Sequence, residues 1–184
     1  ENNFNEDYFK AWAEGRTGYP MVDACMRALS ATGWINFRMR AMLVSFASYH
    51  LWLHWREPAL YLARLFTDYE PGIHYSQVQM QSGTTGINSV RIYNPIKQGI
   101  DHDPLGVFIK KWVPELQDME LRNLHTPWLS TEKIGDYPLP IVDERTGRSS
   151  AMQKIYDVRK GASHRARSTH VLKQHGSRRL AKKR

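Results

Sequence analysis

The sequence predicts an all-α fold with one long ordered loop. Helix start and stop signals recur along the chain, with proline at expected first turns and glycine at an expected end. We find no alternating pattern typical of a half-buried strand, no internal repeat and no heptad series. With 184 residues, of which 41% are hydrophobic, the chain is long enough to bury one sizeable core, and we expect one compact domain.

The first half of the chain predicts two of the helices. The segment "PMVDACMRALSAT" begins at Pro20, which suits the first turn of a helix, and Gly33 supplies a stop. A longer helix should begin near Ile35 or Asn36, continue through the apolar run "AMLVSFASYHLWLHW" and end at about Trp55.

The second half predicts shorter helices separated by irregular chain. Pro58 opens a helix with the sequence "PALYLARLF", and a short helix is expected between Pro104 and Pro114. Residues 67–95 are rich in Gly, Ser and Asn and predict the long loop. Residues 126–147 are punctuated by proline and are expected to wrap over the surface.

The charge of the chain is concentrated at its end. The sequence has 26 Lys and Arg against 18 Asp and Glu, a net charge of +8, yet residues 161–184 hold eight basic residues and no acid. We therefore expect a domain over residues 1–145 and a basic, flexible tail over residues 146–184. A solubilising end and an arm that binds nucleic-acid phosphates are both compatible with such a block.

The single cysteine, Cys25, excludes an internal disulfide and a cysteine-based zinc site and fits a reducing compartment. We therefore expect a cytoplasmic protein. The most apolar run, residues 41–55, contains two serines and two histidines and is shorter than the ~20 residues of a spanning helix. No membrane segment is expected.

Three motifs suggest other chemistry only weakly. His50 and His54 have a spacing that a metal could use, but no Glu and no third ligand accompany them, so we expect no metal. The "DHD" of residues 101–103 is typical of a loop with a helix cap. The "SGTTG" of residues 82–86 resembles a phosphate loop but lacks the lysine and the following helix.

The segment "GWINFRMR" places Arg38 and Arg40 beside an apolar, aromatic-rich helix. Arginine is usually exposed, and a buried arginine costs several kcal/mol unless it is paired. Asp68 and Glu70, in "TDYEPG", are the candidate carboxylate partners.

An ordered series of motifs carries a family resemblance: "AWAEGRTGYPMVDACMRALSATGW", "RMR", "WRE", "TDYE", "RIYNPIKQGIDHDPLGVFIKKWVPEL" and "HTPW". Together, from about Phe9 to Val142, they resemble the C-terminal half of the helical FAD-binding domain of the DNA photolyase and cryptochrome family. The resemblance implies an all-α fold and an FAD cofactor.

The resemblance also implies roles for several residues. Arg40 would pair with Asp68 beside the isoalloxazine ring, where its charge favours the anionic reduced flavin. Glu70 takes the place of the family's second Asp, and His74 takes the place of the asparagine that faces the flavin. Phe37 is expected to contact the cofactor, at a position where many photolyases have an asparagine that touches the lesion.

The implied activity is the light-driven, FAD-dependent repair of UV-induced pyrimidine dimers in DNA by a short photolyase-like protein that acts as a monomer. Trp55 and His74 are the expected catalytic residues, because Trp55 matches the middle tryptophan of the family's electron-transfer chain. DNA contacts are expected from Asn36, Arg38, Gln79, Met80 and Lys97.

Two departures leave an alternative open. The family's Trp-Gln-Trp is replaced by Val78, Gln79 and Met80, which removes the flavin-proximal tryptophan and the tryptophan on which the lesion stacks. The alternative is a non-catalytic, cryptochrome-like photosensor or DNA-binding module. The antenna-binding domain and the earlier helices are also outside the sequence, so it is either a fragment of a longer protein or similar to short photolyase-like proteins.

Overall fold

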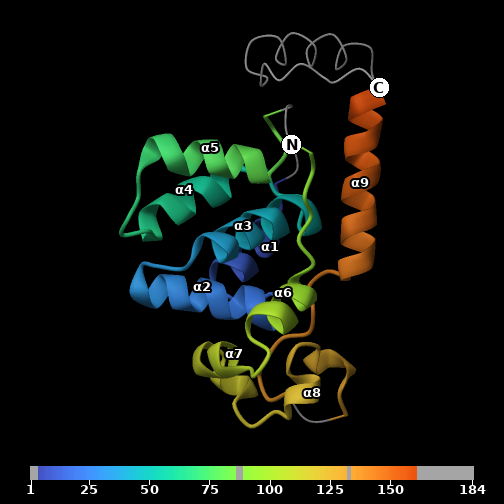
Figure 1. The fold of residues 1–184 in the computed structure, drawn as a ribbon. Coiled ribbons are helices and arrows are strands. Elements are labelled where there is room, and N and C mark those ends of the chain that lie inside the picture. Colours follow the sequence, from blue (N-terminus) through green and yellow to red (C-terminus); the bar gives the residue numbers. More distant parts are fainter. Residues whose placement is uncertain (1–3, 86–88, 132–133, 161–184) are drawn as a thin grey trace, which may run out of the picture.

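The structure is a computed structural model and describes residues 4–85, 89–131 and 134–160. Every regular element among these residues is a helix, and no strand occurs in them, which confirms the all-α prediction (Figure 1). The α-helices are α1 (Glu6–Ala13), α2 (Pro20–Thr32), α3 (Phe37–Ser45), α4 (Arg56–Leu65), α5 (Pro71–Gln81), α6 (Pro95–His102), α7 (Val107–Trp112), α8 (Leu121–Leu124) and α9 (Glu144–Lys160). Shorter helical turns are η1 (Phe46–His50), η2 (Pro114–Leu116) and η3 (Pro127–Leu129).

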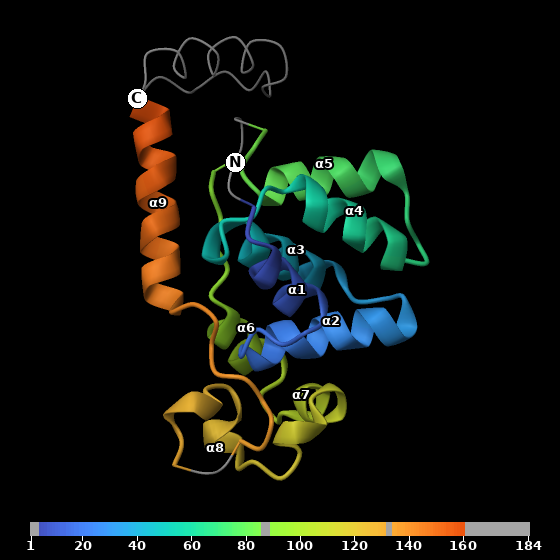
Figure 2. The ribbon, with the colours of Figure 1, turned by 180° about the vertical axis from the view of Figure 1, so that it is seen from behind.

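Helices α2 and α3 lie in the middle of the molecule. Helices α4 and α5 lie on one side of them, α6 to α8 lie below, and α9 stands along the far edge (Figures 1 and 2). The core is built from fully buried side chains of α1, α2, α3 and η1, among them Trp12, Met26, Leu29, Met42 and Phe46. Leu62 of α4 and Val78 of α5 are buried in the same core, which fixes the relative positions of α3, α4 and α5.

The first predicted helix is confirmed as α2. Pro20 occupies its first turn, where no backbone N–H is needed. Gly33 follows Thr32 in the left-handed conformation, with φ of 73°, and its N–H donates to the carbonyl of Leu29 at 2.8 Å.

The predicted long helix from residue 35 to residue 55 is wrong beyond Ser45. The chain continues from α3 into a π-helical turn, and Trp52 then takes a left-handed φ of 52°. The N–H of Leu53 donates to the carbonyl of Ala47 at 2.9 Å, which closes the end of this turn. The apolar pattern persists because the irregular residues Leu51 and Leu53 are also buried. Periodicity alone therefore did not reveal the break.

The next helix begins earlier than predicted. Helix α4 begins at Arg56, two residues before the expected start at Pro58, and the proline is accommodated in its first turn. Part of the predicted long loop is also helical. Glu70 caps α5, its Oε2 accepting from the N–H of Ile73 at 2.7 Å, and Pro71 is the first helical residue. Residues 82–85 and 89–94 stay irregular in the described part of the chain.

The short helix expected between Pro104 and Pro114 is present as α7. The proline-rich segment that follows α7 is also anchored in the core: Tyr137 is buried, and its hydroxyl donates to Oδ2 of Asp23 at 2.6 Å. Asp23 also accepts from the hydroxyl of Thr17 at 2.6 Å and from two backbone N–H groups, those of Thr17 at 2.8 Å and Gly18 at 3.0 Å. Asp23 thus joins α2, the loop before it and a distant segment.

Gly18 sits where the proline-rich segment crosses the start of α2. Its φ is 81°, and a Cβ there would lie 2.5 Å from the backbone of Leu139 and Pro140. We predict that Gly18→Ala lowers the free energy of unfolding by about 2–4 kcal/mol, because it adds both backbone strain and a clash. Urea denaturation would measure this loss of stability.

Gly135→Ala is the matched control for Gly18→Ala. The φ of Gly135 is 55°, but no atom lies within 4 Å of the added Cβ, so a loss of about 1 kcal/mol is expected. Equal losses at the two positions would contradict the crowding at Gly18.

Helix α9 runs across the expected domain boundary at residue 145. It packs on η1, with Ala151 buried and Gly147 against the backbone of His50. The division into a domain and a tail stays a prediction, and the expected flexibility of residues 161–184 falls outside the described part of the chain. None of the helices in the described part is long and apolar enough to cross a membrane.

Candidate cofactor site

A cavity of about 160 Å³ lies between α3, α4 and α5. Its inner walls are apolar and its rim is charged or polar. The walls come from Ala41, Val44, Leu62, Phe66 and Val78, and the rim and remaining walls from Phe37, Arg40, Asp68, Tyr69, Glu70, Ile73, His74, Gln77 and Gln81. The structure therefore places the five predicted cofactor residues, Phe37, Arg40, Asp68, Glu70 and His74, around one cavity.

Arg40 is held in place by three contacts. Its Nε donates to the carbonyl of Ile35 at 2.9 Å, its Nη2 donates to Oδ2 of Asp68 at 2.9 Å, and its guanidinium lies 4.0 Å from the ring centre of Phe66. Only 24% of the Arg40 side chain is exposed, so the charge faces the cavity rather than open solvent. A fixed cation at an apolar cavity attracts a planar anionic or electron-rich ligand.

Two carboxylates occupy the turn between α4 and α5. The hydrogen bond from Arg40 holds the pKa of Asp68 below its usual range, so this carboxylate is ionised and offsets the arginine charge. The carboxylate of Glu70 caps α5 by accepting a hydrogen bond from the N–H of Ile73. Its position at the cavity rim therefore follows from helix capping.

His74 is the titratable imidazole of the cavity. Its Nε2 lies 2.8 Å from the carbonyl of Ala59 and donates to it, which leaves Nδ1 without the proton in the neutral ring. Burial lowers the pKa of His74, and the charge of Arg40 lowers it further against the opposing effect of the Ala59 hydrogen bond. His74 is accordingly neutral at pH 7.

We predict that the imidazole of His74 titrates below 6.5 in the folded protein, as followed by the NMR chemical shifts of its ring protons. Arg40→Gln should raise the midpoint, because it removes a neighbouring positive charge. Because the unfolded state binds this proton more readily, the contribution of His74 to stability is complete above pH 6.5 and declines as the pH falls through the depressed pKa. Arg64→Gln, at an exposed position of α4, should leave the midpoint unchanged. A midpoint above 6.5 would contradict the burial of His74.

Sequence reasoning missed residues on the inner face of α5 and at its approach. Gln77 lines the cavity, and its Oε1 is buried without a hydrogen-bond partner among the described residues. Gln81 lines the same cavity beside Val78, the position expected near the flavin, and Phe66 lies under Arg40. His74, Gln77, Val78 and Gln81 follow helical spacing, a signal that was available only if residues 71–81 were recognised as a helix.

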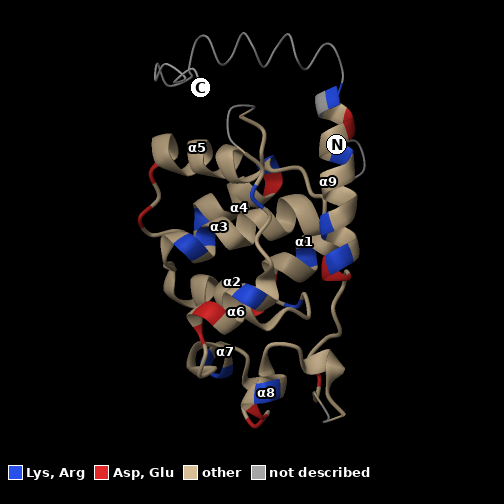
Figure 3. Cartoon of the chain, turned by 45° about the vertical axis from the view of Figure 1, so that its right-hand side comes forward, with Lys and Arg blue, Asp and Glu red and all other residues tan. Residues whose placement is uncertain are grey.

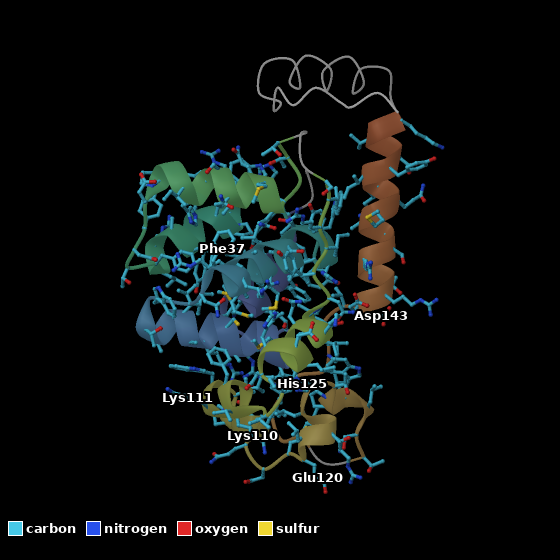
Figure 4. All side chains as sticks on the ribbon, viewed as in Figure 1. Phe37, Lys110, Lys111, Glu120, His125 and Asp143 are labelled. Carbon is cyan, nitrogen blue, oxygen red and sulfur yellow. The ribbon has the colours of Figure 1, made fainter. Side chains whose placement is uncertain are left out.

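The positions that depart from the family pattern lie in or near this cavity. Val78 is 3% exposed and forms part of the cavity wall, whereas Phe37 is 58% exposed at its rim. Phe37 is the first residue of α3, and Figure 4 labels it on the side of the molecule that carries α4 and α5. Gln79 and Met80 are half-buried and lie outside the cavity lining.

Trp55 lies apart from the cofactor residues. It lines a second cavity, of about 370 Å³, with Trp52 and with Ile155 of α9, and its ring packs on His54 at 5.8 Å between centroids. The catalytic roles expected for Trp55 and His74 stay predictions.

The remaining expected DNA contacts are scattered. Asn36 caps α3, its Oδ1 accepting from the N–H of Met39 at 3.0 Å, and Arg38 is exposed on the same helix. Lys97 lies on α6, where its Nζ pairs with Asp101. These side chains lie at the start of α3 and on α6, and their DNA contacts stay predictions.

The two histidines that could have suggested a metal differ in environment. His50 is buried, stacks on Phe46 with ring centroids 5.0 Å apart, and lies 3.7 Å from Glu144. Burial lowers its pKa to about 4, helped by the charge of Arg148. Within the described ranges no three His, Cys, Asp or Glu residues cluster as a metal site would require.

Comparison with known proteins places these residues in a known domain. Residues 1–157 match the family model described as the FAD binding domain of DNA photolyase. The chain is 39% identical over 163 residues to the deoxyribodipyrimidine photo-lyase of Salmonella typhimurium, covering 86% of this chain and 34% of that protein. It is 38% identical over 157 residues to cryptochrome-1 of Arabidopsis thaliana, covering 78% of this chain and 23% of that protein.

A solved structure shows the same likeness in three dimensions. The photolyase of Sulfolobus tokodaii, crystallised with two FAD molecules, superposes with a TM-score of 0.79 at 37% identity, over 84% of this chain and 36% of that chain. The chain spans about a third of the length of the photolyases that it matches. It belongs to the DNA photolyase and cryptochrome family, of which it represents the FAD-binding domain.

Proposed function

We propose that the cavity between α3, α4 and α5 binds the isoalloxazine part of FAD. The observation that carries this proposal is the ion pair of Arg40 and Asp68 at the rim of an apolar cavity. The donor set fits the cofactor. Ring-sized apolar walls suit a planar heterocycle, the guanidinium suits its electron-rich edge, and the unpartnered Oε1 of Gln77 is available to a ring N–H.

The size of the cavity agrees with a site for part of the cofactor. Its volume of about 160 Å³ is below the ~300–1,000 Å³ of typical cofactor and drug sites. In this proposal Arg40, Asp68 and Gln77 hold the polar edge of the ring system, and Val44, Phe66 and Val78 contact its apolar surface.

The proposed activity is the light-driven repair of UV-induced pyrimidine dimers in DNA by a short photolyase-like protein. Bound FAD would supply light absorption and electron transfer. The protein's own residues would set the electrostatics: Arg40 keeps a positive charge at the ring, and His74 stays neutral, with its Nε2 proton donated to the carbonyl of Ala59. In this proposal Phe37, exposed at the rim, contacts the cofactor and leaves part of its ring open to a base flipped out of the duplex.

A second function is favoured by the cavity wall itself. Val78 stands where the family has its flavin-proximal tryptophan, and no tryptophan is among the described residues that line the cavity. A chain that binds FAD without repairing DNA, as a photosensor or DNA-binding module, is therefore the competing proposal.

A repair assay separates the two functions. The protein, reconstituted with FAD and reduced, would be illuminated with UV-damaged single-stranded and double-stranded DNA, and loss of dimers would be measured by chromatography of the digested DNA. Dimer loss in the light but not in the dark supports repair. No dimer loss from a protein that carries flavin supports the photosensor or binding module and contradicts repair.

A further inference from the structure

Helix α9 presents a basic and aromatic face to solvent. Arg145, Arg148, Met152, Tyr156 and Lys160 follow one another at intervals of three or four residues, so they form one row along the helix, here termed the α9 row. Met152 is 48% exposed and Tyr156 is 54% exposed, and the ammonium of Lys160 lies 4.4 Å from the ring centre of Tyr156. The first four side chains line one shallow concave surface.

Three acidic groups lie near this row. Glu144 lines the same concave surface but is only 16% exposed, and its carboxylate lies 3.7 Å from the buried ring of His50. Asp157 accepts from the amide of Gln153 at 3.0 Å, and Asp143 caps the helix by accepting from the N–H of Thr146 at 2.8 Å. The α9 row is therefore positive along its length, and Figure 3 shows Lys and Arg distributed along α9 from its start to its end.

The sequence concentrates positive charge in the same part of the chain. Residues 144–184 contain 13 of the 26 Lys and Arg but only two of the 18 acids, Glu144 and Asp157. Residues 1–143 hold the other 13 basic residues against 16 acids, so the rest of the chain is slightly negative. A partner drawn to this end of the chain is a polyanion.

The opposite face of α9 argues against insertion of this helix into a lipid bilayer. Its small and apolar residues Gly147, Ala151 and Ile155 face η1 and the second cavity, so they are not available for insertion into a membrane. The exposed apolar groups of the row are one thioether and one aromatic ring, flanked by cations. That combination suits bases that stack on the ring while cations hold the phosphates.

We propose that the α9 row is a binding surface for single-stranded nucleic acid, independent of light, of FAD and of any lesion. Arg145, Arg148 and Lys160 contact phosphates, and Tyr156 with Met152 provides the stacking platform. The surface spans about 25 Å, the length of a helix of 17 residues. It lies at the far edge of the molecule from α4 and α5 (Figures 1 and 2).

The test measures binding of the full chain to a short, undamaged, fluorescein-labelled oligothymidylate by fluorescence anisotropy, in the dark and without added FAD. Tyr156→Ala should weaken binding by about 5- to 100-fold at constant salt without changing the salt dependence, whereas Tyr156→Phe should bind as the parent does. Replacing Arg145 and Arg148 together with Gln should reduce the slope of log K against log salt by about 1.4, because two phosphate contacts are lost.

The matched control replaces Lys110 and Lys111 of α7 with Gln. These lysines lie at the opposite end of the molecule from most of α9 (Figure 4). The ammonium of Lys111 also lies over an aromatic ring, 5.2 Å from the ring centre of Trp112. The control should leave the salt slope unchanged. The proposal is overturned if Tyr156→Ala binds as tightly as the parent, if the α7 variant lowers the slope as much as the α9 variant, or if the α9 variants instead lose binding to phosphatidylserine vesicles.

Discussion

Replacing Asp23 with alanine is expected to lower the free energy of unfolding by about 3–5 kcal/mol, a large part of the stability of a typical domain. The carboxylate is fully buried and accepts four hydrogen bonds, from the N–H groups of Thr17 and Gly18 and the hydroxyls of Thr17 and Tyr137. Alanine leaves these donors without an acceptor in a site that excludes water. Urea denaturation followed by circular dichroism would measure the loss.

Two further variants locate the effect in this cluster. Tyr137→Phe removes one donor and its bond together and should cost about 1 kcal/mol. Combined with Asp23→Ala, it should cost less than the sum of the separate losses, because both remove the same hydrogen bond. Additive losses, or an Asp23→Ala variant as stable as the parent, would contradict the role of Asp23 in joining α2 to the proline-rich segment.

Arg40→Ala is expected to weaken FAD binding by about 10- to 100-fold, which follows from the loss of one charge-assisted contact at a partly buried site. Asp68→Ala should weaken it less, because Arg40 keeps its contacts with Ile35 and Phe66. Isothermal titration of the apoprotein with FAD would measure both affinities. Flavin affinity unchanged in both variants would contradict the assignment of the ion pair to the cofactor site.

The chain offers a matched control for this ion pair. Arg27 pairs with Glu115 at 2.7 Å, with 19% and 21% of the side chains exposed, and neither residue lines the cavity. Arg27→Ala should reduce stability and leave FAD affinity unchanged. A comparable loss of affinity in this variant would show that the effect of Arg40→Ala arises from destabilisation.

The sequence predicted the helices that have local signals at their ends. Helix α2 could be predicted from its local signals, Pro20 at its start and Gly33 at its end. The break in the helix after Ser45 could not be predicted, because Leu51 and Leu53 remain buried outside the helix and continue the apolar pattern. Helix α5 was missed because residues 67–95 as a whole are rich in Gly, Ser and Asn, most of which follow the helix, and because its capping residue, Glu70, is rarer in this role than Ser, Thr, Asp or Asn.

In the candidate site, too, some residues could be predicted from the sequence and others could not. Arg40 and Asp68 were paired through family resemblance, and the structure gives the pair a distance of 2.9 Å. Gln77 could not be found, since its place in the cavity depends on the helical path of residues 71–81. The contact of Arg40 with Phe66 depends on the packing of α3 against the end of α4, which no local pattern encodes.

The central claim is that the described residues form a flavin site around Arg40 and Asp68. The most direct test is an absorption spectrum of the purified protein after incubation with FAD and removal of unbound cofactor, recorded before and after denaturation to count flavin per chain. We expect flavin bands corresponding to about one FAD per chain, and a much lower content in Arg40→Ala. A folded protein that retains no flavin after this incubation would contradict the claim.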